Sequence, residues 1–519
     1  MNRAARWAAS HVGLLVVLAI AVAIGEVPRV LAACCAPPGA TGLGTAWFIN
    51  DFAQYESAMR QGATQSGWLI HDPFTSEANP AAFMFPLYVG MGKLAATLRV
   101  APTLVEHVVE ILARVLLVVS LWRFAHAFTS TRTAAHWAFA LALFGSGFEL
   151  FAGLASGALA NLGLTVYTGN WSYETNTFGL LFAAPHVPLA MAATLELARD
   201  GLRPRQRVTW PWVLKTALLG AAVAMLDAFH VPVLLGAIGI AGLVFWGSGR
   251  GVANLAGALV AAIAALPVLW PTIATFSFQT FWVTTYSTQN VLPSPLPHEL
   301  LVDLGPTLVL AIVGVVMLRG RVAPFGVLVW LGLELIGMYL PVPYQRRLGF
   351  GLQPTLAILA ANGLIAACEA FSRRGALVAR QAVVALAASG TLLVLVGVVG
   401  SGFKDAPLGV YRSTTDLDAA AAWLNSQATS SDVILADWDA SNYLAPRTPA
   451  RVFGGHPVAT LHPAQKQFEI ASVFAHAASL SVAHVLGVQW LVYGPAEAGL
   501  SGPPDPAFQS GPVRVYRVA

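Results

Sequence analysis

The chain has 519 residues, and only 10% of them are Asp, Glu, Lys or Arg, against roughly 25% in an average soluble domain. The mean hydropathy is +0.66, and long apolar runs with so few charges need lipid as their solvent, which excludes an ordinary soluble protein. The formal net charge of +4 comes from scattered basic residues without interleaved aromatics, so nucleic acid is excluded as a partner.

The first apolar run ends near two adjacent cysteines, Cys34 and Cys35. The residues before Cys34 resemble a lipoprotein cleavage box, but Glu26 and Arg29 interrupt the apolar stretch that such a signal needs. We therefore expect a retained first span, and lipidation of Cys34 is left open. The three cysteines show no metal-ligand spacing, so no structural metal site is expected.

Apolar runs predict a polytopic, all-helical membrane protein. The predicted inner connections are short and carry arginine, whereas the outer loops at 154–177 and 271–302 are longer. About eleven spans are expected, at residues 7–25, 105–128, 134–153, 178–198, 213–229, 231–247, 252–270, 303–318, 323–340, 353–371 and 382–401.

A further apolar stretch, 83–98, is barely long enough to cross and contains Pro86 and Lys93. If it does not span, every predicted inner connection carries arginine, as the positive-inside rule requires. If it does span, those arginines face outward. We therefore predict an interfacial helix at 83–98 within a long first outer loop, 26–104. The N-terminus is then cytoplasmic, and the C-terminus lies outside the cell's inner membrane.

The pattern changes after residue 401. Acidic residues open a helix at 416–423, and apolar strands are expected at 432–436, 490–493 and 513–518, with helix again at 464–478. We predict two domains: a transmembrane module over 1–401 and an extracytoplasmic α/β domain over 402–519.

Ionisable side chains gather in the outer halves of the predicted spans, where each costs roughly 2.5–3.5 kcal/mol to insert. Together they indicate a polar cavity that opens outward, although each alone is equally typical of a satisfied interfacial side chain. Arg114 and Glu110 are four residues apart and also fit a simple ion pair. The group comprises Glu106, His107, Glu110, Arg114, Glu149, His186, Asp227 and His230.

The first outer loop carries Asp51, which shares a predicted helix face with Tyr55 and Met59. A carboxylate close to the outer membrane surface suits a general base acting on a hydroxyl, or a metal ligand. An N-cap or a solvated loop charge is the alternative.

Arg346 and Arg347 form the one arginine pair in a short outer loop. Two guanidinium groups there suit a phosphate or pyrophosphate headgroup. Contact with ordinary lipid phosphates is the alternative.

These residues resemble the GT-C glycosyltransferases, which include protein O-mannosyltransferases and bacterial aminoarabinose transferases. The resemblance rests on Asp51 soon after the first span, a juxtamembrane helix and an outer soluble domain. Two further stretches resemble a related bacterial group: Tyr173-Glu174 with Pro185-His186, and Asn442–Pro446 with His456-Pro457 and Lys466. The chain departs from the family in having Phe52 where many relatives have Glu, and in lacking a juxtamembrane Pro-Pro-Leu.

The resemblance implies an inverting glycosyltransferase that takes a sugar from a polyprenyl-phosphate donor to an extracytoplasmic lipid, glycan or protein. Asp51 would be the catalytic base. The donor phosphate would contact Arg346, Arg347 and Arg114, and the substrate would contact Tyr55, Glu174, His186 and His456. No metal ligands are assigned, and a divalent cation is left open. A transporter or flippase and a non-catalytic membrane scaffold are the rival interpretations.

Overall fold

The computed structural model describes residues 12–42, 49–156, 161, 174–205, 207–317, 324–369, 371–401, 412–475 and 479–518. Arg3, Arg6, Arg319 and Arg321, on which the predicted orientation partly rests, lie outside these residues, as does Tyr173 of the family motif. The chain is mostly helical and carries a small C-terminal sheet. It divides into two compact units.

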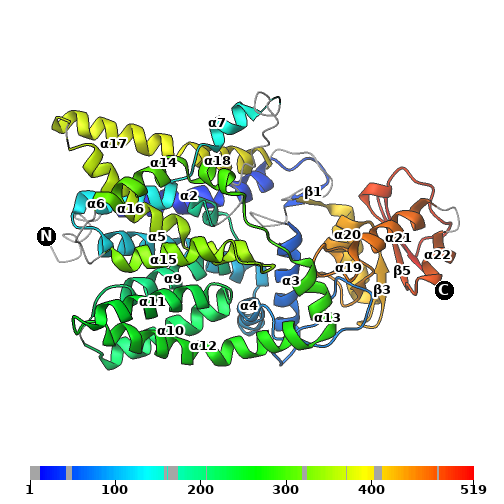
Figure 1. The fold of residues 1–519 in the computed structure, drawn as a ribbon. Coiled ribbons are helices and arrows are strands. Elements are labelled where there is room, and N and C mark those ends of the chain that lie inside the picture. Colours follow the sequence, from blue (N-terminus) through cyan, green and yellow to red (C-terminus); the bar gives the residue numbers. More distant parts are fainter. Residues whose placement is uncertain are drawn as a thin grey trace. The chain divides into compact units, whose positions relative to one another are not determined.

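Unit 1 comprises residues 1–25, 110–270 and 292–398. It is built from helices, among which α9 to α12 run side by side (Figure 1). Four of its helices, α2, α5, α12 and α18, continue into unit 2. The helices are α2 (Val12–Cys34), α5 (Pro102–Phe128), α6 (Arg132–Phe144), α7 (Glu149–Leu154), α9 (His186–Gly201), α10 (Trp210–Leu226), α11 (Val231–Trp246), α12 (Val252–Phe278), α14 (Pro297–Met317), α15 (Phe325–Gly337), α16 (Leu352–Ala367), α17 (Arg373–Ala387) and α18 (Ser389–Ser401), with short 3-10 turns η1 (Thr177–Leu181) and η3 (Gln345–Gly349).

Helix overlaps every predicted span, but residues 145–148 interrupt the third and residues 182–185 the fourth, and residues 7–11, 318, 323 and 370 lie outside the described residues. The predicted count of eleven crossings stays a prediction. Among the described residues, five helices are long and apolar enough to cross a membrane, or six if the bent pair α17 and α18 is one span. The helices α10, α11 and α15 are apolar but shorter than 18 residues. Large apolar side chains such as Leu218, Leu243 and Leu259 are more than 60% exposed, which is typical of a surface that contacts lipid.

Small residues allow the helices α14 and α16 to approach closely. A methyl group added at Gly314 would lie 2.0 Å from the carbonyl oxygen of Leu359, and one added at Gly363 would lie 2.0 Å from that of Leu310. Backbone-to-backbone packing through glycine is how helices associate where lipid removes the hydrophobic driving force. It accounts for Gly314 and Gly363 at this contact.

Unit 2 comprises residues 26–109, 271–291 and 399–519. The first outer loop and the C-terminal segment therefore belong to one compact unit. Its N-terminal part contains strand β1 (Ala40–Gly42) and helices α3 (Ile49–Thr64) and α4 (Pro86–Leu98). The latter confirms the predicted helix near 83–98. Strand β1 pairs antiparallel with β2 (Arg412–Thr414), and the middle segment forms α13 (Thr280–Trp282) and the π-helical turn η2 (Val283–Ser287).

The C-terminal part of unit 2 is a five-stranded sheet in the order β4-β3-β5-β7-β6. Strand β3 is parallel to β4 and β5, whereas β7 is antiparallel to its neighbours β5 and β6. The strands are β3 (Val433–Leu435), β4 (Arg451–Val452), β5 (Trp490–Tyr493), β6 (Phe508–Ser510) and β7 (Val513–Arg517), and the helices are α19 (Thr415–Gln427), α20 (Trp438–Leu444), α21 (Pro463–Ala475) and α22 (Ser479–Val485), with η4 (Pro495–Glu497).

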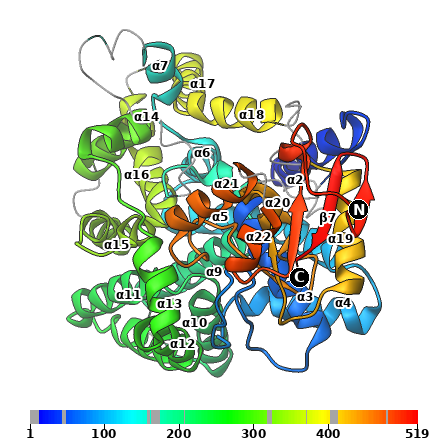
Figure 2. The same ribbon diagram turned by 90° about the vertical axis from the view of Figure 1, so that its right-hand side faces the viewer.

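Alternate residues of each strand enter different cores. Ile434 and Val492 pack with residues of α19 and α20, whereas Leu435 and Leu491 pack with residues of α21 and α22. This alternation is the period of two that a strand imposes on its side chains, and it gives three layers with helices on both faces. Helix α19 lies beside β7 in Figure 2. The predicted helices and strands of this segment are confirmed.

Candidate functional site

Asp51 lies in the first turn of α3, where the partial positive charge of a helix N-terminus favours a carboxylate. Its side chain is 52% exposed. The helix beneath it is fixed by close packing on α4, because a methyl group at Gly92 would lie 1.9 Å from the carbonyl oxygen of Met59. The fold therefore presents an accessible carboxylate on a firmly held helix.

His456 lies beside Asp51, although the two residues are far apart in the sequence. Its Nε2 atom is 3.7 Å from Asp51 Oδ1, and the imidazole is almost fully buried. The backbone N–H groups of Val458 and Ala459 donate to its Nδ1 atom, at 3.1 and 3.0 Å. The loop that follows β4 thus delivers one predicted substrate-binding residue directly to the predicted base.

The amide of Gln54, on the same face of α3 as Asp51, bridges His456 and a tyrosine. One of its ends lies 2.5 Å from His456 Nε2, and the other lies 2.8 Å from the hydroxyl of Tyr286 in η2. Sequence reasoning missed both residues. The spacing of three residues from Asp51 could have pointed to Gln54, but no local pattern marks Tyr286.

Tyr55 points into an aromatic cluster of unit 2. Its ring stacks on Tyr88, with centroids 4.3 Å apart, and meets Phe85 edge-on at 5.2 Å. Met59, predicted on the same face, is fully buried. Tyr286 packs against the same core as Tyr55. Burial raises the pKa of the Tyr286 phenol, and the charges of Asp72 and Asp51 raise it further.

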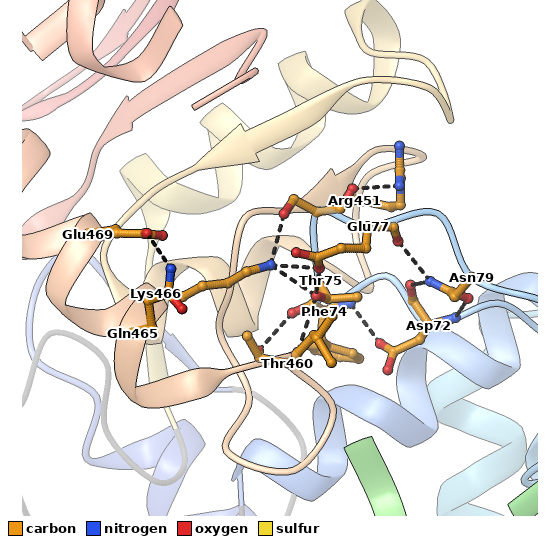
Figure 3. A network of polar contacts seen from close by, with 12 residues as sticks. Asp72, Phe74, Thr75, Glu77, Asn79, Arg451, Thr460, Gln465, Lys466 and Glu469 are labelled. Atoms are coloured by element: carbon orange, nitrogen blue, oxygen red, sulfur yellow. Dashed lines mark hydrogen bonds and ion pairs between the residues drawn. The ribbon is translucent and has the colours of Figure 1, made fainter. Parts of the chain in front are cut away.

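A buried lysine ties the first outer loop to the C-terminal domain (Figure 3). The Nζ atom of Lys466 donates to Thr75 Oγ1 at 3.1 Å, to Ser76 Oγ at 2.8 Å and to Glu77 Oε2 at 2.7 Å. Burial lowers the pKa of Lys466, while Glu77 opposes that effect. With all three of its N–H donors used, Lys466 is a structural link rather than a ligand-binding group.

Thr460 makes a second link between the C-terminal domain and the first outer loop. Its hydroxyl donates to the carbonyl oxygen of Phe74 at 2.8 Å. The ring of Phe74 in turn lies against the imidazole of His456, with centroids 5.5 Å apart. The side chain of Gln289 donates to the carbonyl oxygens of Val458 and Thr460. Segments from three parts of the sequence therefore hold His456 in place.

The predicted phosphate-binding arginines lie in unit 1. Arg346 Nε is 3.5 Å from Glu174 Oε2, and the Arg347 guanidinium is 5.4 Å from the centre of the Phe229 ring. Glu174 is buried, whereas Arg346 keeps 24% of its side chain exposed. The structure thus pairs Glu174, predicted to contact the substrate, with Arg346, predicted to contact the donor phosphate.

Arg114 is 1% exposed. Its Nε atom donates to the carbonyl oxygen of Leu181 at 2.7 Å, and its guanidinium is 3.6 Å from Glu110. The predicted ion pair with Glu110 is therefore present. His186 is the first residue of α9 and is partly buried.

The predicted residues fall into two groups. Asp51, Tyr55 and His456 belong to unit 2, and Arg114, Glu174, His186, Arg346 and Arg347 belong to unit 1. That both groups serve one site stays a prediction. Within the part of the chain that the structure describes, no three His, Cys, Asp or Glu side chains are grouped as metal ligands.

No protein-family model matches the sequence, and no curated protein matches it. Solved structures do. The oligosaccharyltransferase of Archaeoglobus fulgidus, in a crystal structure with Zn and sulfate, is 13% identical with a TM-score of 0.50, and the match covers 92% of this chain and 67% of that one. Its apo form gives a TM-score of 0.51 at 13% identity, covering 92% and 69%.

A cryo-EM structure of a mutant of the mycobacterial arabinofuranosyltransferase AftD is 16% identical with a TM-score of 0.53. That match covers 98% of this chain but only 41% of the arabinofuranosyltransferase, so the chain spans about two fifths of that protein. By name, one neighbour is an oligosaccharyltransferase and the other an arabinofuranosyltransferase. At these identities the likeness shows the fold, and the GT-C resemblance drawn from the sequence motifs is confirmed at that level.

Proposed function

We propose that this chain is an inverting membrane glycosyltransferase that moves a sugar from a polyprenyl-phosphate donor to an acceptor outside the inner membrane. The observation that carries the proposal is Asp51, an exposed carboxylate on the rigid helix α3 with a buried histidine beside it, in a chain with the GT-C fold. An accessible carboxylate held in one place is what a general base requires.

In the proposed reaction, an acceptor hydroxyl attacks the anomeric carbon of the donor sugar from the face opposite the phosphate. Its proton passes to the Asp51 carboxylate as the new glycosidic C–O bond forms. The bond between the anomeric carbon and the phosphate oxygen breaks, and its electron pair leaves with the polyprenyl phosphate. One displacement inverts the configuration at the anomeric carbon.

Arg346 and Arg347 are the proposed stabilisers of the leaving phosphate, whose negative charge grows as that bond breaks. A guanidinium carries five N–H donors, and the ion pair with Glu174 is made at the Nε atom of Arg346, at 3.5 Å. Arg114, which is buried and fixed by Leu181 and Glu110, is proposed to add positive charge to the same region. Tyr55, His186 and Glu174 are proposed to line the substrate path.

A transporter or flippase is the second candidate, and one observation favours it. His230 and Glu334, both fully buried in unit 1, lie 3.8 Å apart, and ionisable residues inside membrane helices often mark a translocation path. A flippase moves its lipid-linked substrate without changing it. Formation of a glycosylated product therefore distinguishes the two candidates.

The test is transfer of labelled sugar from polyprenyl phosphate carriers in membranes that hold wild type, Asp51→Asn or Asp505→Asn. Asp505 is an exposed loop residue of unit 2 at positive φ, a conformation that Asn tolerates, so its variant is a matched control. We expect incorporation with wild type and Asp505→Asn, and a loss of about 10²-fold or more with Asp51→Asn. Equal incorporation by all three would refute the role of Asp51 as base.

A further inference from the structure

His456 is held in one tautomer by its own loop. Two backbone N–H groups, from Val458 and Ala459, donate to Nδ1 at 3.1 and 3.0 Å. A neutral imidazole carries one N–H donor and one acceptor nitrogen. Because Nδ1 is engaged as the acceptor, the proton resides on Nε2, the atom that faces Asp51 and Gln54.

This assignment fixes the orientation of the Gln54 amide. The structure places the amide nitrogen 2.5 Å from His456 Nε2, which would set one donor against another. Oxygen and nitrogen of an amide are distinguished by their partners, and turning this amide by 180° lets its oxygen accept from Nε2–H. Its nitrogen then donates to the hydroxyl oxygen of Tyr286, at the 2.8 Å contact.

We propose that His456, Gln54 and Tyr286 form a hydrogen-bonded chain that holds the Asp51 end of α3 in place, with the single Nε2–H of His456 donated to the Gln54 oxygen, so that His456 is not a base. The proposal rests on the function proposed above. A base at Nε2 would need an acceptor nitrogen there, and Nδ1 already has that role. The distance of 3.7 Å to Asp51 is longer than a hydrogen bond, so His456 acts on Asp51 through Gln54, which lies on the same face of α3.

Two substitutions separate the two nitrogens of the imidazole. His456→Asn retains an acceptor near the position of Nδ1, which preserves the loop contacts with Val458 and Ala459, but it removes the donor. His456→Gln retains a donor near the position of Nε2. We expect His456→Asn to fold but to lower the transfer rate by about 10- to 100-fold, because misplacing a reacting group by about 1 Å has an effect of this size. We expect the transfer rate of His456→Gln to remain within about threefold of wild type.

A double-mutant cycle provides the first readout. If His456 acts through Asp51, His456→Asn combined with Asp51→Asn will be no slower than Asp51→Asn alone, because residues that act as a unit are not additive. Additive losses, or a His456→Gln variant as slow as His456→Asn, would overturn the proposal.

The second readout does not depend on activity. Nitrogen-15 spectra of the full-length protein, labelled at its 12 histidines, report the tautomer of each imidazole, and the signal lost in His456→Asn identifies His456. We expect a neutral ring with its proton on Nε2. A proton on Nδ1 would refute this inference even if sugar transfer is observed. A wild type that transfers no sugar, but shows the Nε2–H tautomer, would contradict the proposed function and leave this hydrogen-bonded chain supported.

Discussion

Asp72 is a buried carboxylate, and only one of its two oxygens accepts a described hydrogen bond. Its Oδ1 atom accepts from the N–H of Phe74 at 2.8 Å, whereas Oδ2 has no described hydrogen-bond partner. Burial raises the pKa of Asp72 to about 7, against the opposing effects of the Phe74 N–H and Lys466, while the charge of Glu77 raises it further. The folded protein therefore holds a proton on Asp72 that the unfolded chain releases.

This difference predicts how stability depends on pH. The stabilising contribution of protonated Asp72 is fully present below about pH 4 and is lost as pH rises towards and through about 7. At about 1.4 kcal/mol per pKa unit, the loss amounts to at most about 4 kcal/mol. We expect Asp72→Asn to flatten the pH dependence of thermal unfolding between pH 4 and 7, with Asp505→Asn as the control. An unchanged slope would show that Asp72 is not the group responsible.

Arg346 and Arg347 provide a second prediction about individual residues. Replacing Arg346 and Arg347 together by Ala removes two charged hydrogen-bond donors, each worth roughly 1.5–3 kcal/mol. We expect the donor concentration for half-maximal transfer to rise by at least about tenfold, with a smaller change in the maximal rate. The twin arginines Arg373 and Arg374, exposed at the start of α17, provide the control double variant. Unchanged donor saturation in the first variant would remove these arginines from the donor site.

At the scale of elements, the position of Asp51 depends on how α3 packs on α4. A methyl group at Gly92 would lie 1.9 Å from the carbonyl oxygen of Met59, whereas one at Gly90 would meet only the Trp68 ring at 3.6 Å. We expect Gly92→Ala to separate the helices and to destabilise unit 2 by about 1–3 kcal/mol, with a lower transfer rate. Gly90→Ala, on the same helix, should unfold at or slightly above the temperature of wild type. Equal melting temperatures for the two variants would contradict this packing.

The elements themselves could be predicted from local pattern. Apolar runs located the helices, and the alternation in 490–493 and 513–518 located β5 and β7, because both signals lie within a few residues. The short strands β4 and β6 were missed, since Arg451–Val452 and Phe508–Ser510 are too brief to show a period. The apolar pattern does not establish the number of membrane crossings. A crossing helix must be long enough and carry few charges, and α10, α11 and α15 are apolar but shorter than 18 residues.

At the scale of the whole molecule, the sequence identified Asp51 and His456 but not their proximity. Gln54 and His456 are 402 positions apart, and no period or motif encodes so distant a contact. The links made by Lys466 and Thr460 span 391 and 386 positions, and that made by Gln289 spans 169. The family resemblance indicated Asp51 and His456 as separate candidates. Only the folded chain shows that the two side chains are neighbours.

The central claim is that Asp51 serves as the base in a single, inverting displacement. The measurement that tests it most directly is the anomeric configuration of the product formed by purified full-length protein in proteoliposomes, from a polyprenyl-phosphate sugar of known anomer. We expect a product of opposite configuration with wild type and almost none with Asp51→Asn. A product that retains the donor's configuration, or full product formation by Asp51→Asn, would contradict it.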